Sequence, residues 1–250
     1  MNITEMHIAV NHGVDKIHAF QADTILNEEI DLELNKAQES FIKTRYNSMG
    51  NRYGKGFEQS QKRIDDIRLL VVEEVLDACF RGQVYPGFFV DFVTLPTSEV
   101  YMFLVNHRSL VRHRNCTPLV ANVDWEMTGA CDKREMLSQF TQVIAKNKYS
   151  QHDDIYTLLE DPFNTTKHSA PLTTIREDFI EVYTDDTFIV DRVSILYIRR
   201  PVEVSITTLT DCELPIHTHR EIVEMAVDSI LEGISDPRYR THQMETLKSE

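Results

Sequence analysis

The sequence has no long apolar segment, no paired cysteines and no excess of positive charge. Its longest unbroken apolar run is Val100 to Val105, far below the ~20 residues that span a bilayer, so we expect no membrane partner. Forty acidic residues stand against 26 basic ones, which gives a formal net charge of −14. A surface of this sign repels nucleic acid at long range. The composition therefore argues against a protein that wraps DNA.

A disulfide framework and a secretory signal are also missing. The first ten residues carry Glu5 and His7 and have no basic head followed by an apolar block, so we expect no secretory signal. Scattered cysteines in such a chain are typical of buried thiols rather than of disulfides. The four cysteines are Cys79, Cys116, Cys131 and Cys212. The sequence therefore predicts synthesis in a reducing cytoplasm and folding without cross-links.

Recognisable catalytic motifs are absent, since neither G-x-S-x-G nor H-E-x-x-H occurs. Clustered carboxylates could hold Mg²⁺ for nuclease chemistry, but adjacent residues on a helix point apart. Three acidic doublets are present: Asp65/Asp66, Asp153/Asp154 and Asp185/Asp186. The best metal-ligand cluster is Cys212, His217 and His219, which lacks the fourth ligand of an ordinary zinc site. We therefore expect no enzyme and no cofactor, and metal binding at this cluster stays open.

Helical periodicity dominates both ends of the chain. Apolar residues recur at spacings of three and four in three N-terminal stretches, which predicts helices with one buried face. The stripes are Ile3, Met6, Val10, Val14, Ile17 and Phe20; Leu26, Ile30, Leu34, Ala37 and Phe41; and Phe57, Ile64, Ile67 and Leu70. A further helix should begin near Thr218 and Glu221, whose spacing matches a capping box, and it should end before Pro237.

The middle of the chain favours strands. Runs of β-branched and aromatic residues, bounded by Pro, Thr and Asp, are typical of β-sheet. The runs are 88–93, 100–105, 179–183, 188–193, 193–198 and 202–208. Residues 179–193 predict a hairpin, in which Asp185 and Asp186 satisfy turn backbone groups. The alternation over 202–208 predicts a half-buried strand.

These patterns predict an α+β fold: a helical bundle from the N- and C-terminal regions with a β-rich central insertion. The expected regions are an N-terminal helical region at 1–84, a β-rich region at 85–211, and a C-terminal helix and tail at 212–250. We expect the last of these to pack back on the N-terminal helices, because both carry apolar stripes that need a partner.

A basic segment interrupts the acidic chain. Between residues 43 and 63, six basic residues stand against Glu58 alone: Lys43, Arg45, Arg52, Lys55, Lys62 and Arg63. Such a segment suits docking to an acidic protein surface or to phosphates, whereas the alternative is a solvated loop. Arg45, Arg52 and Lys55 are therefore candidate interface residues.

Several strings of residues resemble a structural protein of crAss-like tailed bacteriophages. In the N-terminal part they are 13–17 (GVDKI), 31–37 (DLELNKA) and 53–58 (YGKGFE). In the C-terminal part they are 151–156 (QHDDIY), 161–163 (DPF), 185–191 (DDTFIVD), 197–201 (YIRRP), 212–215 (CELP) and 236–239 (DPRY). The resemblance covers most of the chain and is weakest over 115–149.

The resemblance implies a virion protein of the phage neck. Such proteins form a ring, with twelve subunits where the ring matches the portal, that joins the capsid portal to the tail. Their partners are further copies of the chain, the portal and other neck and tail ring proteins. Genomic DNA passes without specific binding, and no catalytic residues accompany the family. Two other interpretations stay open: a metal-dependent nuclease or hydrolase that uses the acidic doublets, and a cytosolic adaptor that forms no ring.

Ring subunits contact their neighbours through two different faces, so exposed apolar residues are candidate interfaces. The aromatic candidates are Phe88, Phe89, Tyr101 and Phe103, and filling the β-region core is the alternative role for them. The tail candidates are Pro237, Arg238 and Tyr239, in a polar segment that could become ordered on a partner.

Overall fold

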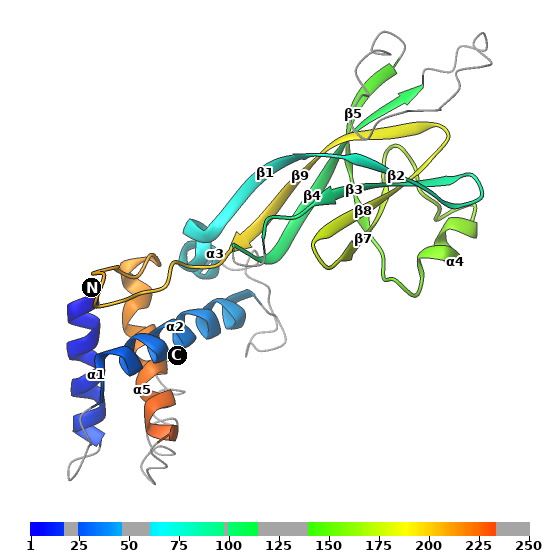
Figure 1. Ribbon diagram of the computed structural model, residues 1–250. Coiled ribbons are helices and arrows are strands. Elements are labelled where there is room, and N and C mark those ends of the chain that lie inside the picture. Colours follow the sequence, from blue (N-terminus) through cyan, green and yellow to red (C-terminus); the bar gives the residue numbers. More distant parts are fainter. Residues whose placement is uncertain (18–24, 47–60, 98–99, 115–139, 234–250) are drawn as a thin grey trace. The chain divides into compact units, whose positions relative to one another are not determined.

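The computed structural model describes residues 1–17, 25–46, 61–97, 100–114 and 140–233 (Figure 1). The chain divides into two compact units. One unit, called here the helical unit, contains residues 1–71 and 200–250, and the other, the β unit, contains residues 72–199. Each unit is described separately below.

The helical unit is built on three long amphipathic helices, α1 (Ile3–Ile17), α2 (Asn27–Tyr46) and α5 (His219–Gly233). Helix α5 packs against both α1 and α2. The close approach of α1 to α5 depends on Gly13, because a Cβ atom there would lie 2.8 Å from Cγ2 of Val227. The shorter elements are α3 (Gln61–Ile67), the 3₁₀ turn η2 (Arg68–Leu70) and the 3₁₀ turn η4 (Ile216–Thr218).

The long helices confirm most of the predicted stripes, except that Leu26 precedes α2 and is 62% exposed. Phe20 lies outside the described residues. Ile3, Met6, Val10 and Val14 are buried on α1, and α2 has acidic residues in its first turn and Lys43 and Arg45 in its last. The predicted capping box is wrong. The hydroxyl of Thr218 donates to the carbonyl of Pro215 at 2.8 Å, in the turn η4 that precedes α5. The carboxylate of Glu221 is engaged by Arg45 of α2 instead.

The predicted strand at 202–208 is also wrong. Its backbone groups pair with side chains of α2 rather than with another strand, and only an isolated bridge joins Ser205 to Thr210. The side chain of Asn35 accepts from the N–H of Val204 at 2.8 Å and donates to its carbonyl at 3.1 Å. Since these polar groups are already satisfied by a helix, the segment needs no sheet.

The β unit contains two sheets. The four-stranded sheet has the order β1-β9-β4-β5, and the five-stranded sheet has the order β2-β3-β8-β7-β6. Their strands are β1 (Val71–Asp77), β2 (Cys79–Tyr85), β3 (Phe88–Thr94), β4 (Tyr101–Arg114), β5 (Phe140–Lys146), β6 (Lys148–Tyr149), β7 (Leu172–Arg176), β8 (Phe179–Asp185) and β9 (Phe188–Arg199). A short helix, α4 (Ile155–Glu160), lies between β6 and β7 in the chain.

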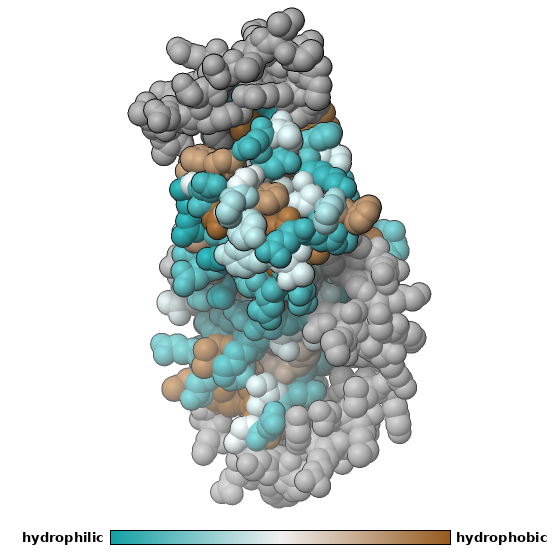
Figure 2. All heavy atoms as spheres, turned by 90° about the vertical axis from the view of Figure 1, so that its right-hand side faces the viewer, coloured by the Kyte–Doolittle hydropathy of each residue, from teal (hydrophilic) through white to brown (hydrophobic). Residues whose placement is uncertain are grey.

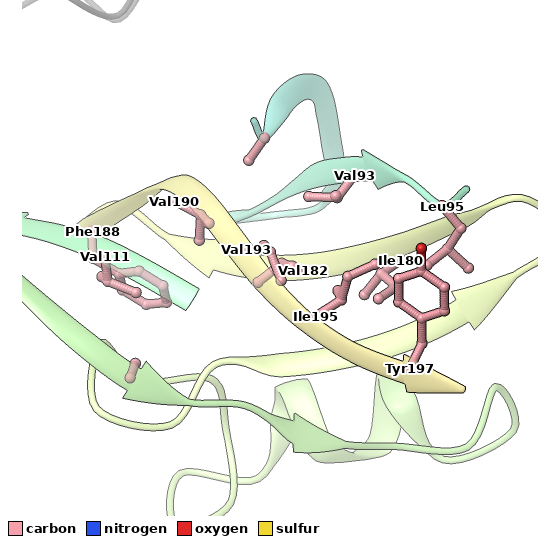
Figure 3. Close-up of a cluster of buried hydrophobic side chains, with 12 residues drawn as sticks. Val93, Leu95, Val111, Ile180, Val182, Phe188, Val190, Val193, Ile195 and Tyr197 are labelled. Atoms are coloured by element: carbon pink, nitrogen blue, oxygen red, sulfur yellow. The ribbon is translucent and has the colours of Figure 1, made fainter. Parts of the chain in front are cut away.

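The core of the β unit lies between the two sheets (Figure 3). The four-stranded sheet contributes Val111, Val193 and Ile195, and the five-stranded sheet contributes Val93 and Val182. In the four-stranded sheet these side chains alternate with outward-facing residues, as expected of a sheet that buries one face. The five-stranded sheet is also covered on its other face, where Val90 and Tyr183 are buried with Ile155 and Leu159 of α4.

The predicted hairpin at 179–193 is wrong in its pairing, although its turn is right. Asp185 accepts hydrogen bonds from the backbone N–H and the hydroxyl of Thr187, as the sequence predicts. However, β8 pairs with β3 and β7, whereas β9 pairs with β4 and belongs to the other sheet. The turn therefore joins the two layers of the unit instead of closing a ladder.

The predicted fold class, a helical bundle with a central β insertion, is wrong. The described residues form nine strands in two sheets and five α-helices, of which α3 and α4 have only seven and six residues. β1 and all of β2 except its last residue, Tyr85, fall in the stretch expected to be helical, 1–84. After Leu70 the chain turns to valine-rich alternation, with Glu73, Val75 and Asp77 exposed, and this pattern favours a strand over a helix.

Candidate functional site: interaction surfaces of the β unit

Arg45, a candidate docking residue, lies inside the helical unit. Its side chain is only 9% exposed, and its Nε donates to Oδ2 of Asp66 at 2.9 Å. It also pairs with Glu221, and its guanidinium lies 4.7 Å from the centre of the Phe41 ring. Arg45 is therefore a structural residue, because a charge already paired in the interior cannot contact a partner. The assignment of Arg45 to a docking surface is corrected accordingly.

The aromatic candidates are half-buried. Phe88 packs against the small cluster around Val90 and Tyr183, and Tyr101 lies against the main core with its ring 5.7 Å from that of Tyr197. Phe89 and Phe103 are also half-buried. Phe88 and Tyr101 therefore contribute part of their surface to the two core clusters. The remaining candidates, Arg52, Lys55, Pro237, Arg238 and Tyr239, lie outside the described residues.

The three metal-ligand candidates make separate contacts. The thiol of Cys212 donates to Oε1 of Gln38 at 3.5 Å, and burial raises its pKa. His217 contacts Asp66 at 2.8 Å, and His219 contacts the carbonyl of Leu214 at 2.7 Å. In the part of the chain that the structure describes, no group of three or more His, Cys, Asp or Glu residues is arranged to hold a metal ion.

The acidic doublets do not form one cluster. Asp66 is fully buried as the partner of Arg45 and His217, whereas Asp65 is partly exposed. Asp154 precedes α4, and Asp185 closes the turn before β9. A nuclease site would need carboxylates that converge on a metal ion, and within the described ranges no three His, Cys, Asp or Glu side chains gather in this way.

The outward face of the four-stranded sheet carries exposed apolar and charged residues together. Opposed residues share a face of a sheet, so the register of β4 with β5 places Arg108 beside Lys146 and Leu110 beside Ile144. We call this surface the outer face. Its residues are Glu73, Val75 and Asp77 on β1; Arg192, Ser194 and Leu196 on β9; Asn106, Arg108 and Leu110 on β4; and Gln142, Ile144 and Lys146 on β5.

Charge is distributed unevenly across the outer face. On the β1 side, Asp77 pairs with Arg192 at 2.9 Å and Glu73 accepts from the hydroxyl of Ser194 at 2.8 Å. On the β5 side the exposed charged residues are Arg108 and Lys146, whereas Arg112, opposite Gln142, is buried and paired with Asp191. The face is therefore acidic at one edge strand and basic towards the other.

A shallow depression of about 150 Å³ lies in the outer face. It is lined by Glu73, Asn106, His107, Arg108, Ser194 and Leu196. Its volume is below the ~300 Å³ of the smallest ordinary small-molecule pockets, so it suits a few waters or one side chain. Burial lowers the pKa of His107 to about 4, so this imidazole is neutral at pH 7 and adds no charge to the depression.

A second surface lies at the end of the β unit that carries α4. Tyr85 contacts Phe88 and Tyr156, with ring centres 6.1 and 6.5 Å apart. Its hydroxyl donates to Glu160 at 2.6 Å, and this hydrogen bond raises the pKa of Tyr85. Figure 2 looks onto the side of the molecule at the right of Figure 1, and its coloured residues are mainly hydrophilic with hydrophobic side chains among them.

The loop after α4 holds Phe163 in the open. Asp161 accepts hydrogen bonds from the N–H of Phe163 at 2.9 Å and from the side chain of Asn164 at 2.7 Å, and these bonds lower the pKa of Asp161. The ammonium of Lys167 donates to the carbonyl of Phe163 at 3.0 Å. Phe163 itself is 85% exposed. Side-chain hydrogen bonds within the loop therefore hold its backbone in place, and the ring of Phe163 is exposed to solvent.

The most exposed apolar residues of the two surfaces, Ile144 and Phe163, were missed by sequence reasoning. Aromatic runs drew attention to Phe88 and Tyr101, which partly fill cores. The sequence does contain a pattern that indicates the exposure of Ile144. In the alternation along β5, Ile144 shares one face of the strand with Gln142 and Lys146, whereas Val143 and Ala145 lie on the other face. An isoleucine in register with polar residues faces away from the core.

Comparison of the sequence with models of known protein families finds no match, and comparison with curated proteins finds none either. Among the described helices, none combines the length and the apolar character needed to cross a membrane.

Proposed function

We propose that the chain is a structural subunit of a phage neck, where copies of it form a ring between the capsid portal and the tail. The proposal rests first on the strings that resemble the crAss-like neck protein, which are distributed over most of the chain. As a ring component the protein binds further copies of itself, the portal and the adjoining neck or tail ring. It performs no chemistry on the genome that passes through.

One structural observation carries the proposal. The β unit presents two separate surfaces with exposed apolar residues, the outer face with Ile144 and the α4 end with Phe163. A subunit of a cyclic ring contacts its two neighbours through different surfaces, and it needs more surface to bind the components above and below.

The charge of the chain agrees with a wall around a DNA channel. The formal net charge is −14, and protein–DNA affinity comes largely from lysine and arginine at phosphates. A predominantly acidic lining gives the genome few sites at which to pause. We retain Arg52 and Lys55 as proposed docking residues of the basic segment, because their charge is opposite to that of the rest of the chain.

Mass photometry of the full-length protein, alone and mixed with the portal protein of the same virion, tests the proposal. We expect a ring-sized species, either at high concentration or on addition of the portal. A protein that stays monomeric under both conditions would refute the ring and favour the adaptor. Such a result would also direct attention to metal-dependent DNA cleavage.

Portal docking is tested separately by charge reversal. The double variant Arg52→Glu and Lys55→Glu should bind the portal roughly tenfold more weakly, with a smaller dependence on salt. The matched control reverses two exposed basic residues of the helices, Lys36→Glu and Arg220→Glu. Equal affinity for the portal in all three proteins would remove the basic segment from the docking surface while leaving the ring itself intact.

A further inference from the structure

The two edge strands of the four-stranded sheet, β1 and β5, are equal in length. Both β1 and β5 have seven residues, and among the described residues each has a neighbouring strand on one side only (Figure 1). An edge strand offers a row of backbone N–H and C=O groups to any strand that approaches. The sheet can therefore be extended from either side.

Apolar side chains mark the middle of both edge strands on the outer face. Val75 of β1 is 59% exposed and Ile144 of β5 is 71% exposed. Soluble proteins usually protect edge strands with charged residues or proline, so a central exposed valine and isoleucine are unfavourable in a monomer. Their exposure is explained if the two edges meet in an assembly.

Charge supplies the second argument and sets the register. On the outer face, Glu73 and Asp77 stand two residues to either side of Val75, while Gln142 and Lys146 stand two residues to either side of Ile144. If Val75 is placed opposite Ile144, an acidic residue of β1 falls opposite Lys146 whichever way the strand runs. Directly opposed residues have Cβ atoms about 5 Å apart, so an ion pair can form at that position.

We propose that β1 of one copy pairs with β5 of the next copy, with Val75 opposite Ile144, so that the four-stranded sheet continues from subunit to subunit. The inference rests on the proposed ring and names its subunit interface. The pairing joins two different edges, so it is head-to-tail and closes into a ring or continues as a filament according to the rotation between copies. Pairing between identical edges lacks this attraction. A β1–β1 contact would place Glu73 and Asp77 of one copy against the same acidic residues of the next, and a β5–β5 contact would place Lys146 against a second copy of the basic strand.

Disulfide trapping tests the pairing in the full-length protein. The variant Val75→Cys with Ile144→Cys, mildly oxidised with copper phenanthroline, should give a ladder of covalent dimers, trimers and larger species on a non-reducing gel. Within one chain the two positions are separated by three strand spacings, about 14 Å, which is too far for a disulfide. The single variants Val75→Cys and Ile144→Cys are the matched controls and should give no ladder, and they also control for the native cysteines.

A second variant keeps the test independent of cysteine chemistry. Ile144→Lys with Lys146→Glu should abolish the ring-sized species in mass photometry, whereas Leu32→Lys, which changes an exposed leucine of α2, should retain it. A ring that forms without a covalent ladder and survives the β5 variant would overturn the edge pairing and leave the proposed function standing. Dimers from Val75→Cys alone would overturn it in favour of β1–β1 contact. If neither ring nor ladder forms, with or without portal, both proposals fail.

Discussion

His107 should make the β unit less stable as the pH falls below neutrality. The side chain is 6% exposed, and its Nε2 lies 2.7 Å from the hydroxyl oxygen of Thr173, which itself donates to the carbonyl of Lys148. Nε2 therefore carries the proton of a neutral imidazole and links β4 to β7. Burial lowers the pKa of His107 from 6.5 to about 4, because the interior disfavours the charged form.

The sign and size of the effect follow from linkage. Between pH 6.5 and pH 4 the unfolded chain binds a proton at His107 that the folded chain does not, so stability is fully present above 6.5 and is lost as the pH falls. Each pKa unit corresponds to about 1.4 kcal/mol. Between pH 7 and pH 5, His107 should therefore lower the free energy of unfolding of the β unit by about 2 kcal/mol.

The assay compares wild type with His107→Gln at both pH values. The glutamine amide can donate to Thr173 but does not titrate in this range, so the variant should lose about 2 kcal/mol of the pH dependence. The protein is equilibrated in urea, then given a brief deuterium pulse at one fixed pH, and peptides from β4 and β7 report the unfolded fraction of the β unit. His12→Gln, at an exposed position of α1, is the control. Identical pH dependence in wild type and His107→Gln would refute the reasoning.

Three further predictions concern residues whose partners the structure identifies. Arg45→Met should destabilise the helical unit by about 3–5 kcal/mol in thermal unfolding followed by circular dichroism, because buried Asp66 loses its cation; adding Asp66→Asn should restore most of the loss. Gly13→Ala should lower the same melting temperature, since the clash with Val227 at 2.8 Å outweighs the ~1 kcal/mol by which alanine favours a helix over glycine. In a Val227→Ala background, where the clash is relieved, Gly13→Ala should instead raise the melting temperature. Asp161→Ala should speed the hydrogen exchange of the backbone amide of Phe163, because that amide loses its hydrogen bond to the Asp161 carboxylate.

Local pattern was enough for the long helices. The stripe from Ile3 to Val14 and the charges at the two ends of α2 predict elements that the structure contains, because helical hydrogen bonds join residues four apart. The turn at Asp185 was predictable for the same reason, since its carboxylate bonds to Thr187, two residues on. In each case the hydrogen-bonded partners are only two to four residues apart in the sequence.

Prediction failed where the partner is distant in the sequence. The segment at 202–208 alternates like a strand, but Asn35 and Asp31 of α2 take its backbone hydrogen bonds. Glu221 stands at the correct spacing for a cap of α5, but Arg45 offers it a full positive charge, and charge-assisted bonds are the stronger kind. Such competition between local and distant partners cannot be read from spacing.

The sequence by itself determined where the long helices form, that the middle of the chain is rich in strands, and which sign of charge the chain carries. Only the tertiary structure decided which strands pair, because β8 and β9 are adjacent in the chain yet belong to different sheets. It also decided which residues are available to partners: Arg45 is enclosed by Asp66 and Glu221, while Ile144 faces outward from an edge strand. Exposure depends on what packs against a residue from elsewhere in the chain, and that information is not contained in its neighbours.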